Sequence, residues 1–127
     1  MTIEAAGEPD RAALRSWPGV AAFVGDEVLV ARQAGTLVAA LAWRTVAPDE
    51  REILYLETAP DRRRQGLARE LLHSLLRGWT GSVFLEVRES NQAALALYTQ
   101  CGFLAVGRRA DYYRNPSESA IVLKFCS

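Results

Sequence analysis

The stretch RRRQGLARELL, residues 62–72, brings three arginines to a glycine just before a leucine-rich segment. A helix that starts after such a turn leaves backbone N–H groups without intrahelical partners, and its dipole adds positive charge at the same end. Both features favour an anion such as phosphate. Gly66 has no Cβ to keep a phosphate off the backbone, and Ala68 is also small. The stretch is therefore a candidate phosphate cradle; the simpler interpretation is a solvated turn before an amphipathic helix.

Charge distribution agrees with a small polyanionic ligand. Residues 1–61 hold ten acidic side chains against five arginines, and residues 62–127 hold five acidic against ten basic, so a net charge of zero conceals an asymmetric chain. The basic half is too mild and too interrupted for a nucleic-acid platform. Neither GxGxxG nor GxxxxGK[ST] occurs, so dinucleotide and nucleoside-triphosphate sites of those types are not expected.

Glu86 is a candidate general base. It lies in SVFLEVR, residues 82–88, where the apolar side chains alternate and occupy one face of a strand. Glu86 falls on the other face, and a carboxylate midway along a central strand is partly removed from water, which suits it to proton transfer. The alternative is a structural carboxylate neutralised by Arg88 or Arg64.

Tyr98 and Asn91 belong to NQAALALYTQC, residues 91–101. Ala94, Tyr98 and Cys101 recur at helical spacing, so Tyr98 is by the simpler interpretation a core aromatic residue. A phenol, with a pKa of about 10, is also a suitable proton donor to a departing thiolate. Asn91 begins the helix, where capping is the expected role of its side chain.

The elements that must position these residues follow from periodicity and turn residues. We expect a short helix at 9–16, an antiparallel hairpin of EVLVARQ and TLVAALAWRTV around Ala34-Gly35, and a strand EILYLETA. An amphipathic helix at 65–79, the strand at 82–88, a helix ending at Gly102 and strands at about 104–114 and 118–125 complete the chain. This order predicts an α/β fold, with a mixed, mostly antiparallel sheet and helices on both faces, in one domain of residues 1–127.

Composition excludes several classes of protein. No stretch approaches the roughly 20 apolar residues that a membrane-spanning helix needs, and the N-terminus lacks a secretory signal pattern. Cys101 and Cys126 have no metal-ligand spacing and make no disulfide framework, so no metal is expected. A reduced cytoplasmic protein is the resulting expectation.

Three stretches resemble a known superfamily. Arg63-Arg64-Gln65-Gly66-Leu67-Ala68 matches the Q/R-x-x-G-x-G/A motif of the GCN5-related N-acetyltransferases (GNAT), and the order of elements resembles that superfamily over nearly the whole chain. LEVRESNQAALALYTQCGF (85–103) and RRADYYRNPSESAIVL (108–123), with its paired Tyr112 and Tyr113, are similar to the RimI-type branch. The arginine motif is short by itself; with the second stretch at the right distance, the combination is specific.

The resemblance implies acetyl-CoA as cosubstrate, with its pyrophosphate on the arginine turn and its pantetheine lying like an added strand where two central strands splay apart. The implied cofactor-binding residues are Leu56, Glu57, Thr58, Arg63, Arg64, Gln65, Gly66, Leu67, Ala68, Arg69 and Asn91. Glu86 matches the base of the RimI-type branch, and Tyr98 matches the general acid of the superfamily. The chain offers no Cys/His or Ser/His arrangement for a covalent intermediate, so direct attack in a ternary complex is expected.

Alternatives remain for the base and the acceptor. Glu52 matches the base position of the histone acetyltransferase branch, and Glu57 is a weaker candidate lower on the same strand. The RimI-type resemblance implies a protein N-terminus as acceptor, the alanine of ribosomal protein S18, with no nucleic acid or membrane partner. The region before the arginine turn is shorter than in that branch, which leaves a small-molecule amine acetyltransferase open. A non-catalytic CoA-binding module is the alternative from another class.

Overall fold

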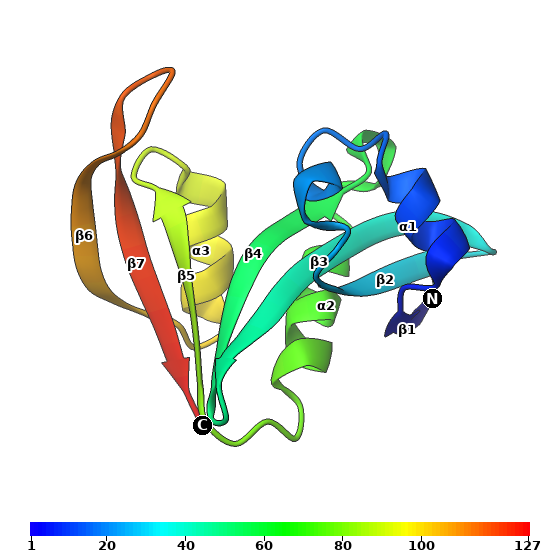
Figure 1. The fold of residues 1–127 in the computed structure, drawn as a ribbon, viewed down its shortest axis with the longest axis horizontal. Helices are drawn as coiled ribbons and strands as arrows, with labels where there is room; N and C mark the ends of the chain where they lie inside the picture. The colour runs from blue at the N-terminus through cyan, green and yellow to red at the C-terminus, as the bar shows by residue number, and fades with distance from the viewer. The chain divides into compact units, whose positions relative to one another are not determined.

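Seven strands form one mixed sheet in the computed structural model, which describes residues 1–127 (Figure 1). In sheet order they are β1 (Thr2–Ala5), β2 (Glu27–Gln33), β3 (Thr36–Ala47), β4 (Glu50–Thr58), β5 (Ser82–Arg88), β7 (Glu118–Cys126) and β6 (Leu104–Tyr113). The helices are α1 (Glu8–Leu14), α2 (Leu67–Leu76) and α3 (Gln92–Gln100), with short 3-10 helices η1 (Val20–Phe23) and η2 (Pro60–Arg62). The expected α/β class and element order are confirmed.

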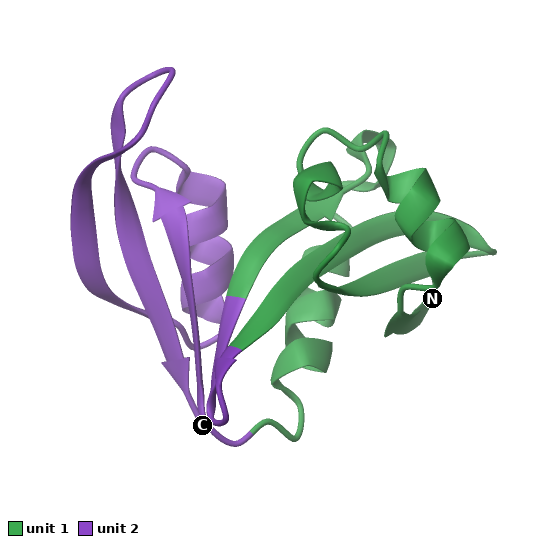
Figure 2. Ribbon diagram, viewed as in Figure 1, with its two compact units in different colours: residues 1–45, 53–79 green, residues 46–52, 80–127 purple.

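Two details differ from the expectation. β1 was not predicted: it pairs antiparallel with β2, yet only Ile3 among its four residues is even partly buried, so its sequence shows no apolar alternation. α2 runs over 67–76 instead of 65–79, because Gly66 and Arg77 are its non-helical caps. The chain divides into two compact units, residues 1–45 with 53–79 and residues 46–52 with 80–127 (Figure 2). We call them unit 1 and unit 2.

Unit 1 is built on the predicted hairpin of β2 and β3. Ala34 and Gly35 at its turn have φ values of 50° and 82°, as a tight hairpin turn requires. One face of the hairpin carries Leu14 of α1 and Val20 of η1, which pack with buried side chains of both strands (Val28, Val30, Ala40 and Ala42). α2 packs against β2 with its own row of buried leucines (Leu67, Leu71, Leu72 and Leu75), and Figure 1 shows it on the opposite side of the hairpin from α1. Apolar burial on both faces makes the hairpin the core of this unit.

A buried carboxylate joins the N-terminal elements of unit 1. Asp10 is only 8% exposed, accepts a hydrogen bond from the Gly7 N–H at 2.8 Å and pairs with Arg32 Nη2 at 2.6 Å. Arg32 Nε also contacts Glu4 Oε1 at 2.9 Å. The Arg32 hydrogen bond, followed by that of Gly7, lowers the pKa of Asp10. The ionised carboxylate therefore ties β1, α1 and β2 together.

Replacing Asp10 with asparagine is expected to destabilise the protein by about 1–3 kcal/mol at pH 7, the usual cost of losing a hydrogen bond to a charged group in a buried site. A lowered pKa stabilises the fold above the ordinary value of 3.8, and this stabilisation disappears as pH falls through the lower, folded-state value. Urea unfolding at pH 7 and pH 3 measures both effects. The control is Asp61→Asn, since the Asp61 side chain is 79% exposed and 3.6 Å from Arg62; equal loss in both variants would contradict the prediction.

Unit 2 is built around β5. This strand pairs antiparallel with β7 along its whole length and parallel with the first residues of β4, from Glu50↔Ser82 to Glu52↔Phe84. As predicted, its odd-numbered side chains are buried (Val83, Leu85 and Val87), and its even-numbered ones are half-buried. Tyr98 of α3 packs edge-on against Phe103, which in turn contacts Phe125 of β7. Phe125 lies opposite Val83 in the ladder, so α3 covers the odd-numbered face.

Candidate active site

The arginine turn forms an open helix start in unit 1. Gly66 is the N-cap of α2 in a left-handed conformation, with φ 75° and ψ 14°, and no side chain caps the helix. The first intrahelical hydrogen bond runs from the Glu70 N–H to the Gly66 carbonyl at 3.1 Å. The N–H groups of residues 67–69 therefore precede the helical ladder. Arg64 is also left-handed, at φ 66°, and such alternating turns make concave sets of backbone donors that suit anions.

Gly66 owes its place to conformation rather than crowding. A Cβ built there would meet no atom within 4 Å, while its positive φ disfavours any other residue. The space above the turn is thus open, as an approaching phosphate requires. Arg63, Arg64 and Gln65 are exposed beside it.

Arg62 and Gln65 fix the turn to the hairpin. Arg62 Nη1 donates to Gln33 Oε1 at 2.8 Å, and Gln33 Nε2 donates to Gln65 Oε1 at 3.2 Å. Gln33 is the last residue of β2, so two side chains of the turn are anchored to one point. The first of the three arginines therefore supports the turn, while the next two extend its positive charge.

The end of β4 carries a strand edge and an unexpected carboxylate contact. The parallel ladder with β5 stops at Glu52↔Phe84, although β4 continues to Thr58, so the segment of Leu56 to Thr58 has no partner in that ladder. The Glu57 side chain accepts hydrogen bonds from the backbone N–H groups of Gly19 at 3.1 Å and Val20 at 2.8 Å. It thereby caps η1, a structural role that counts against Glu57 as a base.

Glu86 lies in unit 2 on the face of β5 opposite α3. Its side chain is only 11% exposed, which confirms the expected removal from water. Its counter-ion is neither of the arginines considered from the sequence, because Arg109 Nε of β6 lies 3.2 Å from Oε1. The hydroxyl of Tyr112 hydrogen-bonds to the same carboxylate, and this contact is the largest cause of the raised pKa of Tyr112. Glu52 contributes to the same shift through its charge, so it also remains a candidate base.

Tyr98 is buried in the aromatic cluster of α3, on the face of β5 and β7 that does not carry Glu86. Burial is the main cause of its raised pKa, so the phenol is protonated over the whole neutral range. That is the state a proton donor needs. Because the base acts on the amine and the acid on the thiolate, the two side chains need not contact each other.

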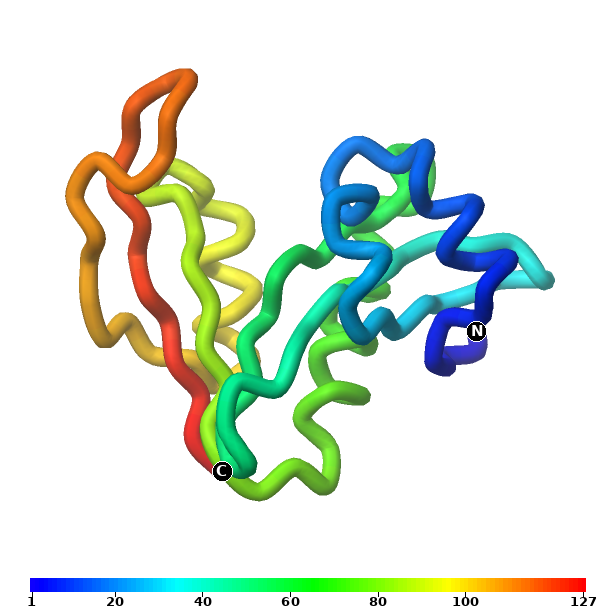
Figure 3. Tube along the Cα trace, viewed as in Figure 1, coloured from blue at the N-terminus to red at the C-terminus, as the bar shows by residue number.

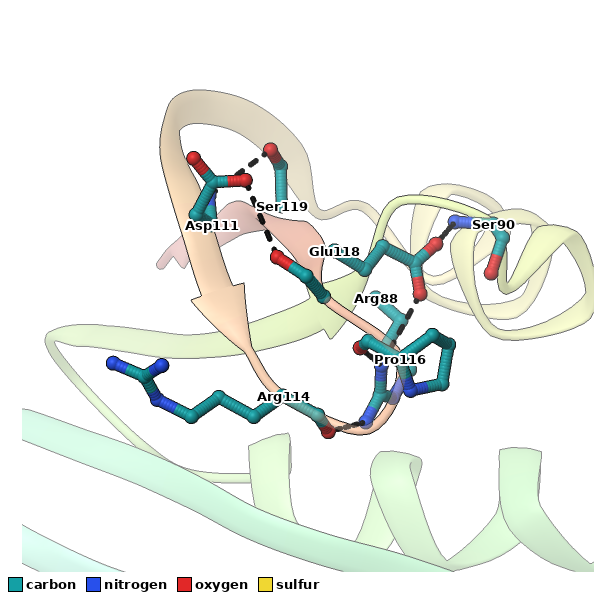
Figure 4. Close-up of polar contacts among 8 residues, drawn as sticks. Arg88, Ser90, Asp111, Arg114, Pro116, Glu118 and Ser119 are labelled. Carbon is teal, nitrogen blue, oxygen red and sulfur yellow. Dashed lines mark hydrogen bonds and ion pairs between the residues drawn. The ribbon is translucent and has the colours of Figure 1, made fainter.

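Asn91 and Arg88 organise the turn between β5 and α3. Asn91 Oδ1 accepts a hydrogen bond from the Ala94 N–H at 3.1 Å, which confirms its capping role. Figure 4 shows Arg88 contacting Glu118 and carbonyl oxygens of the β6–β7 loop, while Glu118 accepts from the Ser90 N–H at 2.7 Å. Arg88 also lies 4.4 Å from the ring centroid of Tyr113. The loop and the start of α3 are thus joined through one ion pair.

Two functional candidates were missed from the sequence: Arg109 as the partner of Glu86, and Tyr112 as its hydrogen-bond donor. The stretch RRADYY held the only signal, because two arginines and two tyrosines stand together there. Which of them meets Glu86 depends on the pairing of β6 with β7, and periodicity does not specify it.

The profile of the Acetyltransferase (GNAT) family matches residues 3–103, which include the arginine turn, Glu86 and Tyr98. The chain belongs to the GNAT acetyltransferase family. No helix of this GNAT protein is both long and apolar enough to cross a membrane.

Among its relatives, the N-alpha-acetyltransferase RimI of Mycobacterium tuberculosis is 40% identical over 100 residues, covering 74% of this chain and 62% of that protein. The crystal structure of the ribosomal-protein-S18-alanine N-acetyltransferase of Escherichia coli superposes with a TM-score of 0.83 at 30% identity, over 98% of this chain and 92% of that one. A GNAT acetyltransferase of Elizabethkingia anophelis with acetyl-CoA bound shares the fold, with a TM-score of 0.81 at 18% identity, over 99% and 97%. The chain spans about three fifths of the length of the curated relatives it matches, 62% for the first two.

Proposed function

We propose that this chain is an acetyl-CoA-dependent N-acetyltransferase that acetylates a protein N-terminal amine, with the alanine of ribosomal protein S18 as the candidate acceptor. The observation that carries the proposal is the uncapped, left-handed start of α2 at Gly66, within the motif that the family uses for its cofactor. The names of the relatives at 40% identity support the acceptor. The cytoplasm, where ribosomal proteins are made, is the expected compartment.

The cofactor would lie along residues of both units. The N–H groups of Gly66, Leu67, Ala68 and Arg69 would bind the diphosphate, with Arg63, Arg64 and Gln65 around it. The open edge of Leu56, Glu57 and Thr58 would pair with pantetheine as an added strand does. Asn91 would contact the cofactor while it caps α3.

The reaction we propose is a direct transfer. An α-amino group has a pKa of about 8, so it is mostly charged at neutral pH and must first lose a proton. Glu86 takes that proton, directly or through water, and the free amine attacks the thioester carbonyl. Backbone N–H groups of residues 56–58 stabilise the oxyanion. The C–S bond then breaks, and the CoA thiolate leaves with a proton from Tyr98.

Replacing Gly66 with alanine is expected to weaken CoA binding about tenfold or more, since hydrogen bonds to charged groups contribute about 1.5–3 kcal/mol each. Gly78→Ala is the matched control. Both glycines flank α2, their φ values are 75° and 73°, and neither would have a neighbour within 4 Å of an added Cβ. Both variants therefore suffer the same left-handed strain, roughly 1–2 kcal/mol. Calorimetry with CoA measures the difference; equal affinities would remove the phosphate cradle.

The acceptor is tested by thiol release, corrected for acetyl-CoA hydrolysis. The substrates are a peptide with the S18 N-terminus, the same peptide with a blocked N-terminus, and a panel of free amines. Turnover with the free N-terminus alone supports the proposal. Turnover with free amines but not peptides would identify a small-molecule acetyltransferase, and CoA binding without any turnover would leave only a CoA-binding module.

A further inference from the structure

One oxygen of Glu86 is buried without a hydrogen-bond partner. Arg109 Nε contacts Oε1 at 3.2 Å, whereas Oε2 is inaccessible to solvent and receives no hydrogen bond from the protein. A buried acceptor left unsatisfied costs about 1–3 kcal/mol, so such an atom in a folded protein calls for an explanation. A donor that arrives with the substrate, an ammonium or a water, would satisfy it.

The partners of Glu86 come from an edge strand. The Arg109 side chain is 58% exposed, and its guanidinium lies 5.5 Å from the ring centroid of Tyr112, which hydrogen-bonds to the same carboxylate. An ion pair with one exposed member contributes little to stability. Its effect here is instead to orient the carboxylate of Glu86.

An irregularity in β6 makes this arrangement possible. Side chains three residues apart in a regular strand point to opposite faces, so Arg109 and Tyr112 would not meet at one group. The pairing of β6 with β7 shifts between Arg109 and Tyr113, and Asp111 between them is left-handed, at φ 51°. Bulges near functional sites commonly redirect a side chain in this way.

Two serines support the irregular segment. The Asp111 N–H donates to Ser119 Oγ, and Ser117 Oγ donates to Asp111 Oδ1, both at 3.4 Å (Figure 4). Figure 3 follows the chain from β6 through this loop into β7. The turn that brings Tyr112 to Glu86 is therefore held from both the strand and the loop.

We infer that Arg109 and Tyr112 are positioning residues that hold Oε1 of Glu86 and thereby reserve Oε2 as the atom that accepts the proton of the acceptor amine. The inference rests on the proposed function, in which Glu86 is the base. The proton passes from the ammonium nitrogen to Oε2, directly or through one water, and the freed lone pair attacks the thioester.

The test compares Arg109→Gln and Arg109→Lys with Arg108→Gln as the matched control. Arg108 is the neighbouring residue on the same strand and pairs with the exposed Glu89 at 2.6 Å. Arg109→Gln is expected to lower kcat for peptide acetylation about tenfold, because a misplaced catalytic group loses its orientation, with the KM for acetyl-CoA unchanged. Lysine keeps the charge and should restore part of kcat, while Arg108→Gln should match wild type.

A second readout needs no substrate. The absorbance titration of Tyr112, taken as the difference between wild type and Tyr112→Phe, reports its environment directly. Its pKa is raised chiefly by Glu86 and lowered by the charge of Arg109. Glu86→Gln should therefore bring the pKa of Tyr112 back towards its ordinary value, and Arg109→Gln should raise it further; Arg108→Gln should leave it unchanged.

The outcomes separate the two hypotheses. If Glu86→Gln abolishes turnover while Arg109→Gln behaves like Arg108→Gln in both readouts, the positioning role is overturned and the proposed function stands. If Glu86→Gln turns over normally, the assignment of the base falls, and the inference falls with it.

Discussion

Replacing Tyr98 with phenylalanine should lower turnover about 10²-fold or more while the affinity for acetyl-CoA stays near that of wild type. The variant loses only the hydroxyl, because the ring remains packed against Phe103 at a centroid distance of 5.3 Å. Burial raises the pKa of Tyr98 and keeps the phenol protonated, so it is available to donate to the thiolate at any neutral pH. Without this donor the thiolate must leave as an anion.

Single-turnover thiol release and CoA calorimetry on the same preparation separate these effects. Thermal unfolding serves as the control, since an intact aromatic cluster predicts a melting temperature close to wild type. Unchanged turnover in a variant that still binds CoA would eliminate Tyr98 as the acid and leave it a core aromatic residue.

Glu86→Gln is expected to reduce the rate by about 10²-fold or more and to alter the shape of the pH–rate profile. Glutamine preserves the size of the side chain but cannot accept a proton, so the reaction depends on the fraction of amine that is already neutral. The remaining activity should therefore rise with pH as the acceptor amine loses its own proton. Initial rates from pH 6 to pH 10, about four units around the amine's pKa of about 8, measure this change.

Glu52→Gln is the informative partner of that experiment. Both carboxylates act on Tyr112, but Glu52 does so only through its charge, whereas Glu86 also hydrogen-bonds to it. If Glu86→Gln keeps the profile of wild type and Glu52→Gln loses it, Glu52 is the base. The chain would then use the position of the histone acetyltransferase branch.

Local features of the chain could be interpreted from its sequence because their causes are local. The alternation of β5 placed Glu86 opposite the buried side chains, and helical spacing put Tyr98 in the core. Gly66 before an apolar stripe indicated an open helix start, since its conformation depends on the residue itself. β1 escaped prediction because its four residues alternate weakly and its partner strand lies more than 20 residues away along the chain.

The sequence by itself determined the α/β class, the element order, the anion-binding turn and the candidate acid and base, all of which depend on residue type and short-range periodicity. Only the tertiary structure decided that Arg109 rather than Arg88 or Arg64 pairs with Glu86. It also decided that the carboxylate of Glu57 caps η1, 37 residues away from Val20. Such contacts depend on strand register and on irregular backbone, as at Asp111, and these are set by packing between segments far apart in the chain.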